Sequence, residues 1–273
     1  MTSGNLKRSL IAATLLVAGW LIPSLVEANT VNLTGGGDAS GTINGAIFQF
    51  TNQQPTGTGV IDPFLRLQDN PNEQGYNTSG GTPFDAKAGI WTHDITFADL
   101  SASSTTINGV LYYTVLLDVN EASGKKSLIS LDELQFYTSS VGSQTTTDVS
   151  SLGTLRYTFN PGDYVLLDYA LNSGSGSGDM LAHIPAAFFA GTLATDFVYL
   201  YSEFGYTAAA DSNSESGFEE WALRLNPSGG GGEGGRPVPE GLPIWFGSGI
   251  LGLLCGVDFI RRQRRKDPLL SPL

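Results

Sequence analysis

The chain has 273 residues and a formal charge of −12, from 14 Lys and Arg against 26 Asp and Glu, with two His and one Cys. A single Cys excludes a disulfide framework. The acidic balance disfavours nucleic acid as a partner, because phosphate binding depends on Lys and Arg. Two His in separate segments also disfavour a multi-histidine metal site.

Residues 1–28 have the order of a secretory signal peptide. Lys7 and Arg8 precede an apolar run over residues 10–22, and the segment ends on a small residue. A run of 13 residues is shorter than the roughly 20 residues that a membrane-spanning helix needs. We therefore expect recognition by the secretion machinery, removal of residues 1–28 and a mature chain that begins near Asn29.

The segment from Asn29 to Leu225 has 197 residues, enough to bury a core and fold as one domain. Short runs of alternating apolar and polar residues, rich in Tyr, Phe, Val and Thr, are separated by Gly, Asn, Asp, Ser and Pro. This pattern predicts an all-β ectodomain, a sandwich or jelly roll. The ten expected strands are Ala46–Thr51, Phe64–Gln68, Ile95–Ala98, Val110–Val119, Ser127–Tyr137, Leu155–Asn160, Tyr164–Leu171, Met180–Ile184, Phe197–Phe204 and Phe218–Leu225.

Two segments of this domain carry a more specific expectation. In the strand expected over residues 197–204, Tyr199 and Tyr201 fall on the face opposite Val198 and Leu200. Both faces of that strand should therefore be covered, as in an inner strand. The Ala-rich stretch Pro185–Leu193 is compatible with a helix, but it is too short to change the class.

Catalytic motifs are absent from the sequence. It contains no G-x-S-x-G elbow, and the glycine before Lys125 completes no phosphate-binding loop. His93 and Asp94 are neighbours, and neighbours in a strand point to opposite faces, so they form no relay pair. We interpret His93 and His183 as structural. The same argument separates neighbouring carboxyls such as Glu219 and Glu220, although two distant strands could still bring two carboxyls into one cleft.

Calcium is the ion that the sequence favours, and no other cofactor is expected. Asp211, Asn213 and Glu215 place oxygen side chains at alternate positions, with Glu219 nearby. These four residues are the candidate ligands, although the spacing does not complete an EF-hand loop. A similar turn begins within residues 118–121 and also lacks the final bidentate Glu.

Charge supports a cation rather than an anion as the partner of the exported part. Residues 29–240 hold seven basic and 23 acidic residues, a net charge of −16. Such a surface repels nucleic acid and anionic lipid.

The C-terminal part does not resemble a folded domain. Residues 226–241 form a Gly- and Pro-rich linker, and residues 242–260 carry no charge except Asp258. A helix over those 19 residues rises about 28 Å, which is sufficient for a bilayer core. A basic tail, residues 261–273, predicts that this end is cytoplasmic. The basic cluster consists of Arg261, Arg262, Arg264, Arg265 and Lys266.

This tail resembles a family of sorting signals. The Val238-Pro239-Glu240 motif, the apolar helix and the Arg-rich end are together similar to the PEP-CTERM sorting domain of exported proteins in Gram-negative bacteria. The family commonly has a second Pro where this chain has Gly241. The resemblance implies recognition by an exosortase, a membrane-embedded cysteine transpeptidase, in species that make exopolysaccharide.

Parts of the expected ectodomain also resemble uncharacterised ectodomains that often precede this tail. That resemblance implies a shared β-rich fold and no known activity. The segments that carry it are Val119-Asn120, Ser130–Gln135, Ser175–Met180, Tyr199–Gly205 and Gly217–Trp221.

We therefore expect a non-enzymatic exported protein, anchored in the membrane before processing and then located at the cell surface or in the exopolysaccharide matrix, with a structural or adhesive role. One alternative is a carbohydrate-binding or carbohydrate-processing protein, in which Trp91, Tyr76 or Tyr112 would stack on a sugar ring. Another is a single-pass anchored protein whose tail is never cut.

Overall fold

A computed structural model describes most of the expected ectodomain. The described ranges are residues 28–53, 61–121, 127–174, 177–207, 212–215 and 217–224. The expected signal peptide, linker, Val238–Glu240 motif, membrane helix and basic cluster lie outside these ranges, as does Asp211. Within them, no helix combines the length and the apolar character needed to cross a bilayer.

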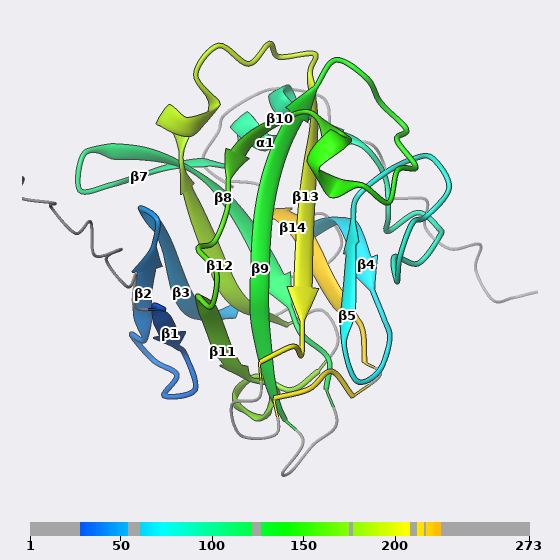
Figure 1. The fold of residues 1–273 in the computed structure, drawn as a ribbon. Helices are drawn as coiled ribbons and strands as arrows, with labels where there is room; N and C mark the ends of the chain where they lie inside the picture. The colour runs from blue at the N-terminus through cyan, green and yellow to red at the C-terminus, as the bar shows by residue number, and fades with distance from the viewer. Residues whose placement is uncertain are drawn as a thin grey trace, which may run out of the picture.

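The described chain forms two β-sheets that pack together as a sandwich (Figure 1). Sheet A has the order β1 (Thr30–Asn32), β11 (Tyr164–Asp168), β9 (Leu128–Ser139), β13 (Phe197–Phe204) and β5 (Glu73–Tyr76), with β10 (Thr154–Tyr157) on β9 and β6 (Ile95–Thr96) on β13. Sheet B has the order β2 (Ser40–Ile43), β3 (Ala46–Gln53), β12 (Gly178–Pro185), β8 (Val110–Asp118), β14 (Glu219–Arg224) and β4 (Ile61–Leu67), with β7 (Ser104–Ile107) on β8. The β1–β11 pair is parallel and the other pairs are antiparallel.

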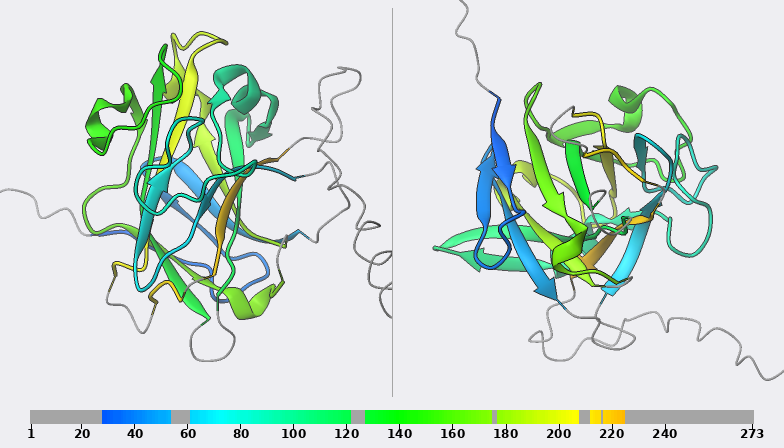
Figure 2. Two further views of the ribbon diagram at one scale, coloured as in Figure 1. Left: turned by 90° about the vertical axis from the view of Figure 1, so that its right-hand side faces the viewer. Right: turned by 90° about the horizontal axis from the view of Figure 1, so that it is seen from below.

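The predicted all-β, sandwich-like class is confirmed, and most expected strands occur with shifted ends. Four strands are absent from the prediction: β1, β2, β5 and β7, each of three or four residues. Their sequences are too short for an alternating pattern. The β7–β8 hairpin turns at Asn108 and Gly109, both at positive φ, and extends beyond the sandwich (Figure 2).

Two expected strands end early because a short helix begins inside them. The strand expected over Ile95–Ala98 stops at Thr96, whose side chain accepts a hydrogen bond from the Asp99 N–H and caps helix α1 (Phe97–Ala102). The strand expected over Tyr164–Leu171 stops at Asp168, which caps the 3₁₀ turn Tyr169–Leu171. The helix-compatible stretch forms only the 3₁₀ turn Ala186–Phe189, and a further 3₁₀ turn spans Val149–Leu152.

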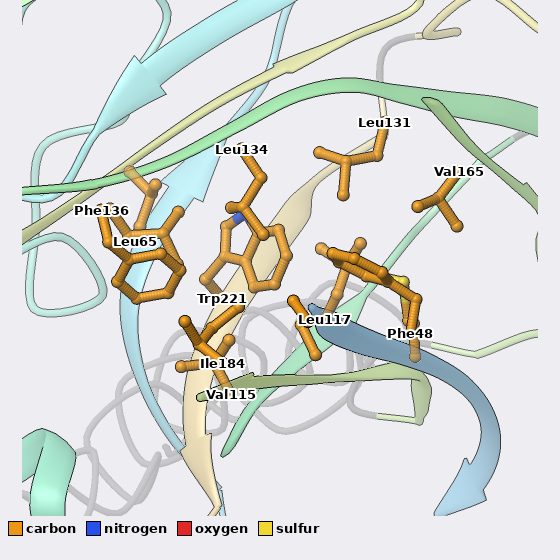
Figure 3. Packing of buried hydrophobic residues seen from close by; sticks show 14 of the residues in the cluster. Phe48, Leu65, Val115, Leu117, Leu131, Leu134, Phe136, Val165, Ile184 and Trp221 are labelled. Carbon is orange, nitrogen blue, oxygen red and sulfur yellow. The ribbon is translucent and has the colours of Figure 1, made fainter. Parts of the chain in front are cut away.

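The main core lies between the sheets and surrounds Trp221. Figure 3 shows this indole of sheet B with Leu65 and Leu117 of the same sheet, next to Leu134 of sheet A. The indole N–H donates to Ser202 Oγ at 3.0 Å, so its polar atom is satisfied in the core. Burying an aromatic or aliphatic side chain of this size contributes about 1.5–3 kcal/mol.

A second cluster covers the outer face of sheet A and confirms the expectation for β13. Val198 and Leu200 lie in the main core, whereas Tyr199 and Tyr201 pack with Tyr76 in the second cluster. Because both faces of β13 are buried and β9 and β5 pair with its edges, it is an inner strand.

Candidate functional site

Three loops meet at the end of the sandwich where β13 ends and β14 begins, the lower end in Figure 1. The backbone N–H of Ser214 donates to the Pro71 carbonyl at 2.9 Å, and its hydroxyl donates to the Asp69 carbonyl at 3.0 Å. The Ser130 N–H donates to the Ser212 carbonyl at 3.1 Å. These bonds fasten residues 212–215 to the β4–β5 loop and to β9.

Glycines allow the loops to approach this closely. A Cβ added to Gly217 would overlap the backbone carbonyl of Asn120. Gly205 has a φ of +79°, and a Cβ there would lie 2.6 Å from the Pro71 carbonyl oxygen and 2.7 Å from the Ser214 nitrogen. Larger side chains would therefore push the loops apart.

Glu73, Glu121 and Glu219, which we call the carboxyl cluster, lie at this end. Strand periodicity places Glu219 on the same face of β14 as the core residue Trp221. Glu73 shares a face of β5 with Gly75, and a Cβ added to Gly75 would lie against the core residue Leu67. Glu73 and Glu219 have no exposed surface. Two opposed sheets thus direct one glutamate each into the same end of the core.

Glu73 and Glu219 are in direct contact through their carboxyl groups. Glu73 Oε2 accepts a hydrogen bond from the Asp69 N–H at 3.0 Å, and Glu219 Oε1 accepts one from the Asn120 N–H at 3.4 Å. The other oxygens, Glu73 Oε1 and Glu219 Oε2, have no further donor among the described residues, and the two carboxyls are hydrogen-bonded to each other. Glu121 Oε2 accepts the Glu215 N–H at 2.8 Å, which joins the third carboxyl to the 212–215 segment.

Burial favours the protonated form of both contacting glutamates. It raises the pKa of Glu73 to about 7, and Asp85 and Asp69 add negative charge nearby. Burial also raises the pKa of Glu219 well above its usual value, with further contributions from Glu73 and Glu121. Since the two carboxyls share one proton, their contact lowers the pKa of Glu73 and raises that of Glu219.

No basic side chain neutralises these charges within the described ranges. The one ion pair found there joins Arg66 to Glu220, the neighbour of Glu219 on the opposite face of β14. No group of three or more Asp, Glu, His or Cys side chains in that part of the chain is placed to hold a metal ion. Glu73 and Glu219 thus form no ion pair with any described residue.

Three of the four calcium ligands predicted from sequence lie within the described residues. Glu219 is part of the carboxyl cluster, but Asn213 is exposed, and Glu215 is bonded to Glu121 through its backbone N–H. Asp211 lies outside the described residues. Sequence analysis did not identify Glu73, although the turn that it noted within residues 118–121 contains Glu121.

A second pair of glutamates lies across the outer face of sheet A. Glu133 and Glu203 are directly opposite on β9 and β13. Glu133 Oε1 accepts hydrogen bonds from the Phe159 N–H at 3.1 Å and the Thr158 hydroxyl at 3.2 Å. Glu203 Oε1 accepts one from the Tyr201 hydroxyl at 2.5 Å. This outer pair therefore has donors.

Both histidines occupy structural positions. His183 is buried on β12 and its Nδ1 lies 2.9 Å from the Thr114 hydroxyl. Burial lowers the pKa of His183 to about 4, so it is neutral at pH 7. The strand assumed at His93 and Asp94 is wrong, because β6 begins at the next residue. Asp94 instead accepts hydrogen bonds from the Ser143 N–H and hydroxyl, at 2.8 and 3.1 Å.

Two of the three aromatic residues considered for sugar stacking are buried. Tyr76 has no exposed surface and its hydroxyl donates to the Thr146 carbonyl at 2.8 Å, and Tyr112 is also buried. Trp91 is half-buried, and the Arg66 guanidinium lies 5.2 Å from its ring centroid and 4.8 Å from that of Phe218.

An open depression of about 260 Å³ lies elsewhere, near the turn before β3. It contains no carboxylate, and its lining residues are Asn44, Leu155, Arg156, Tyr157, Thr158 and Phe188.

Comparison with known proteins finds no matching family model, no matching curated protein and no matching solved structure. The function must therefore be argued from the residues themselves.

Proposed function

We propose that the chain is a non-enzymatic exported protein whose β-sandwich has a structural or adhesive role at the cell surface or in the exopolysaccharide matrix. The observation that carries this proposal is where the polar side chains lie and which groups they bond. The contacting pair of Glu73 and Glu219 is enclosed in the core, where a substrate has no access. The hydroxyls of Tyr76 and Tyr199 donate to backbone carbonyls of the loop that follows β9. The two buried acids are thus closed to a substrate, and the two tyrosine hydroxyls are used in contacts within the fold.

Delivery of the protein to the cell surface is the part of the proposal that rests on the sequence. The Val238-Pro239-Glu240 motif would be recognised by an exosortase-type membrane protease, with the apolar segment and basic cluster holding the chain in the membrane until processing. The described domain ends at Arg224 of β14, and the Gly-rich linker follows within two residues. A linker of that composition separates recognition of the tail from folding of the sandwich.

The test compares two variants of the tagged full-length chain in an exosortase-containing host. Replacing both Pro239 and Glu240 with Ala should retain the chain in the membrane at its unprocessed mass. The matched control replaces Glu233 and Pro237, the same residue types in the same linker but outside the motif, and should be processed normally. Identical processing and location of both variants would leave an ordinary single-pass anchor.

Carbohydrate binding remains the second candidate because of one observation. The half-buried Trp91 ring lies beside Arg66, which also bonds Glu220, so an aromatic surface, a cation and an anion are close together. Tyr76 and Tyr112 offer no open ring face, so this alternative depends on Trp91. If it holds, replacing Trp91 with Ala should abolish retention on immobilised exopolysaccharide while far-ultraviolet circular dichroism stays unchanged.

A further inference from the structure

Two hairpins of sheet B turn on an Asn-Gly pair, and the first of them is held against the sandwich. The β2–β3 hairpin turns at Asn44 and Gly45, both at positive φ. The Asn44 side-chain amide donates to the Thr158 carbonyl at 2.7 Å. Ile43 and Ala46, which flank the turn, have no exposed surface. This hairpin is therefore part of the packed fold.

The β7–β8 hairpin has the same turn residues but lies differently. It turns at Asn108 and Gly109 and projects from the sandwich (Figure 2). Val110 and Leu111, which follow the turn, are 48% and 47% exposed. Adjacent exposed apolar side chains on a projecting element are a feature of interaction surfaces. The sandwich itself thus leaves the tip of this hairpin uncovered.

The outer edge of β7 has unused backbone groups. Among the described strands, β7 pairs only with β8. The Thr114 N–H donates to the Ser103 carbonyl at 3.2 Å, and hydrogen-bonded pairs recur at every second position of an antiparallel ladder. Thr106 and Leu111 are consequently opposite each other without hydrogen bonds between them. The N–H and C=O of Thr106 therefore point away from β8, and no hydrogen bond from another described residue reaches them.

Two other edge strands show how pairing with a further chain is prevented. In β4, Pro63 lacks an N–H and Arg66 adds a charge. In β5, the Gln74 N–H donates to Asp85 Oδ2 at 2.8 Å, and the Gln74 carbonyl accepts from the Asp85 N–H at 3.0 Å. Charged side chains, proline and covering loops are common means by which proteins protect sheet edges. β7 has neither a charge nor a proline, since residues 100–117 contain no residue of either kind.

Charge and strand geometry identify the kind of partner. Residues 29–240 have a net charge of −16, so two copies of the chain repel each other over most of their surfaces. An uncharged strand that projects from the domain lets two copies approach with the least repulsion. The edge of an antiparallel strand is also self-complementary, because each outward residue offers one donor and one acceptor. An acidic glycan or an anionic lipid would need Lys or Arg at this edge, which has none.

We propose that the outer edge of β7 pairs antiparallel with the same edge of a second copy of the chain. A twofold axis would relate the two copies, and their hairpins would join into one continuous ribbon. The N–H and C=O of Thr106 would bond to the partner strand, which would also cover the half-buried Ile107. The contact is small, so we expect a reversible dimer with a dissociation constant on the order of 100 µM. This inference goes beyond the proposed function, because it names a partner of the sandwich and does not depend on the sorting tail.

The first experiment is chemical cross-linking of the full-length protein, purified in detergent and used near the expected dissociation constant. Cys255→Ser removes the one native cysteine, and either Thr106→Cys or Val141→Cys is then added. A short bismaleimide reagent, which reaches across two facing strands in either register, should link most Thr106→Cys chains into dimers. Val141 is 61% exposed and lies in the loop after β9, so Val141→Cys is the matched control and should stay monomeric. Absence of Thr106→Cys dimers, or equal linkage of both variants, would overturn the proposal.

Charge exchange then tests the geometry of the dimer. Thr106→Lys and Thr106→Glu each place like charges on both sides of the axis, so each alone should weaken self-association at least about tenfold in sedimentation velocity. An equimolar mixture of the two variants should restore dimers, which a misfolded variant cannot do. Leu193 is 65% exposed and lies outside the hairpin, so Leu193→Lys is the control and should dimerise like the unmodified chain.

Two results of the charge exchange would contradict the assignment. Dimers that persist in both charged variants would place self-association in another part of the chain. A mixture that stays monomeric would show that the two β7 edges do not face each other.

Discussion

Two pairs of glutamates on opposite faces of sheet A show how context decides what a carboxyl does. Glu133 and Glu203 oppose each other on the outer face, where backbone, Thr and Tyr donors bond them. Glu73 and Glu219 meet between the sheets, where each has one backbone donor and the two carboxyls are otherwise bonded only to each other. The residue type is the same in both pairs. The supply of donors separates a pair bonded by its surroundings from a pair whose two carboxyls must share a proton.

Glu219 and Glu220 are neighbours in β14, and they too differ in their surroundings. Strand alternation places Glu219 inside without a cation and Glu220 outside against Arg66. The predictions below test whether donors and cations, rather than burial alone, distinguish these groups.

The largest effect is expected from Asp179, a buried carboxyl outside the cluster. Burial raises its pKa to about 8, the Val119 N–H bond to Oδ2 opposes that rise, and Asp118 and Asp168 add to it. The pKa of Asp179 in the folded state lies above its usual value. The contribution of the protonated carboxyl to stability is therefore complete below about pH 4 and is lost as the pH rises through 8. Such a shift corresponds to a loss on the order of 3–5 kcal/mol in the free energy of unfolding between these two pH values.

The check compares Asp179→Asn with the unmodified protein in EDTA at pH 4, 6 and 8 by urea unfolding. The two should have equal free energies of unfolding at pH 4, and the variant should be the more stable at pH 8. A constant difference across this range would mean that Asp179 does not titrate as its surroundings require.

Gly217→Ala should have the next largest effect, because it forces apart the loops around the carboxyl cluster. The added Cβ would overlap the Asn120 carbonyl, so the backbone must move, at a cost of about 2–3 kcal/mol. We expect a loss of this size in the free energy of unfolding, measured by urea unfolding. Gly35→Ala is the control, since no atom lies within 4 Å of its added Cβ, and it should change the free energy of unfolding by less than about 0.5 kcal/mol.

The sequence predicted the parts of the fold that depend on local pattern. Long strands such as β8 and β13 have enough alternating residues to be recognised, whereas the four residues of β2 or β7 do not. The early end of the strand at Thr96 had a usable signal, because an acid follows three residues later and completes a capping box. At Thr96 the capping box prevails over the alternating pattern, so the strand ends there and the helix begins.

The candidate site was predictable only in part because it is assembled by tertiary contacts. Glu73, Glu121 and Glu219 lie in three distant segments, and each one alone resembles an ordinary polar turn or strand end. The alternation of oxygen side chains drew attention to Asp211–Glu215, whose described residues contribute backbone hydrogen bonds near the cluster. Sequence spacing detects ligands within one loop, and it does not detect ligands that two sheets bring together.

Arg66→Lys should have a smaller effect and tests the cation beside Glu220. Lys keeps the charge but loses the planar guanidinium, whose Nε donates to Glu220 Oε1 at 2.5 Å and which stacks on Trp91 and Phe218. We expect a loss of about 1 kcal/mol in the free energy of unfolding. A double-mutant cycle with Glu220→Gln measures the coupling, and a coupling energy of zero would show that the ion pair contributes nothing.

Tyr201→Phe should have the smallest effect and tests the outer pair of glutamates. The Tyr201 hydroxyl donates at 2.5 Å to Glu203 Oε1 and lies 2.7 Å from Gln74 Oε1, while its ring remains packed in the second cluster. Phe preserves the ring and removes the donor, so the cost should be about 0.5–1.5 kcal/mol, the net value of one hydrogen bond. Because Glu203 is only partly buried, water can replace the lost donor, so urea unfolding should show a loss no larger than this range. A loss well above this range would mean that Glu203 depends on this single donor despite its access to water, and the distinction between the outer and the inner pair would fail.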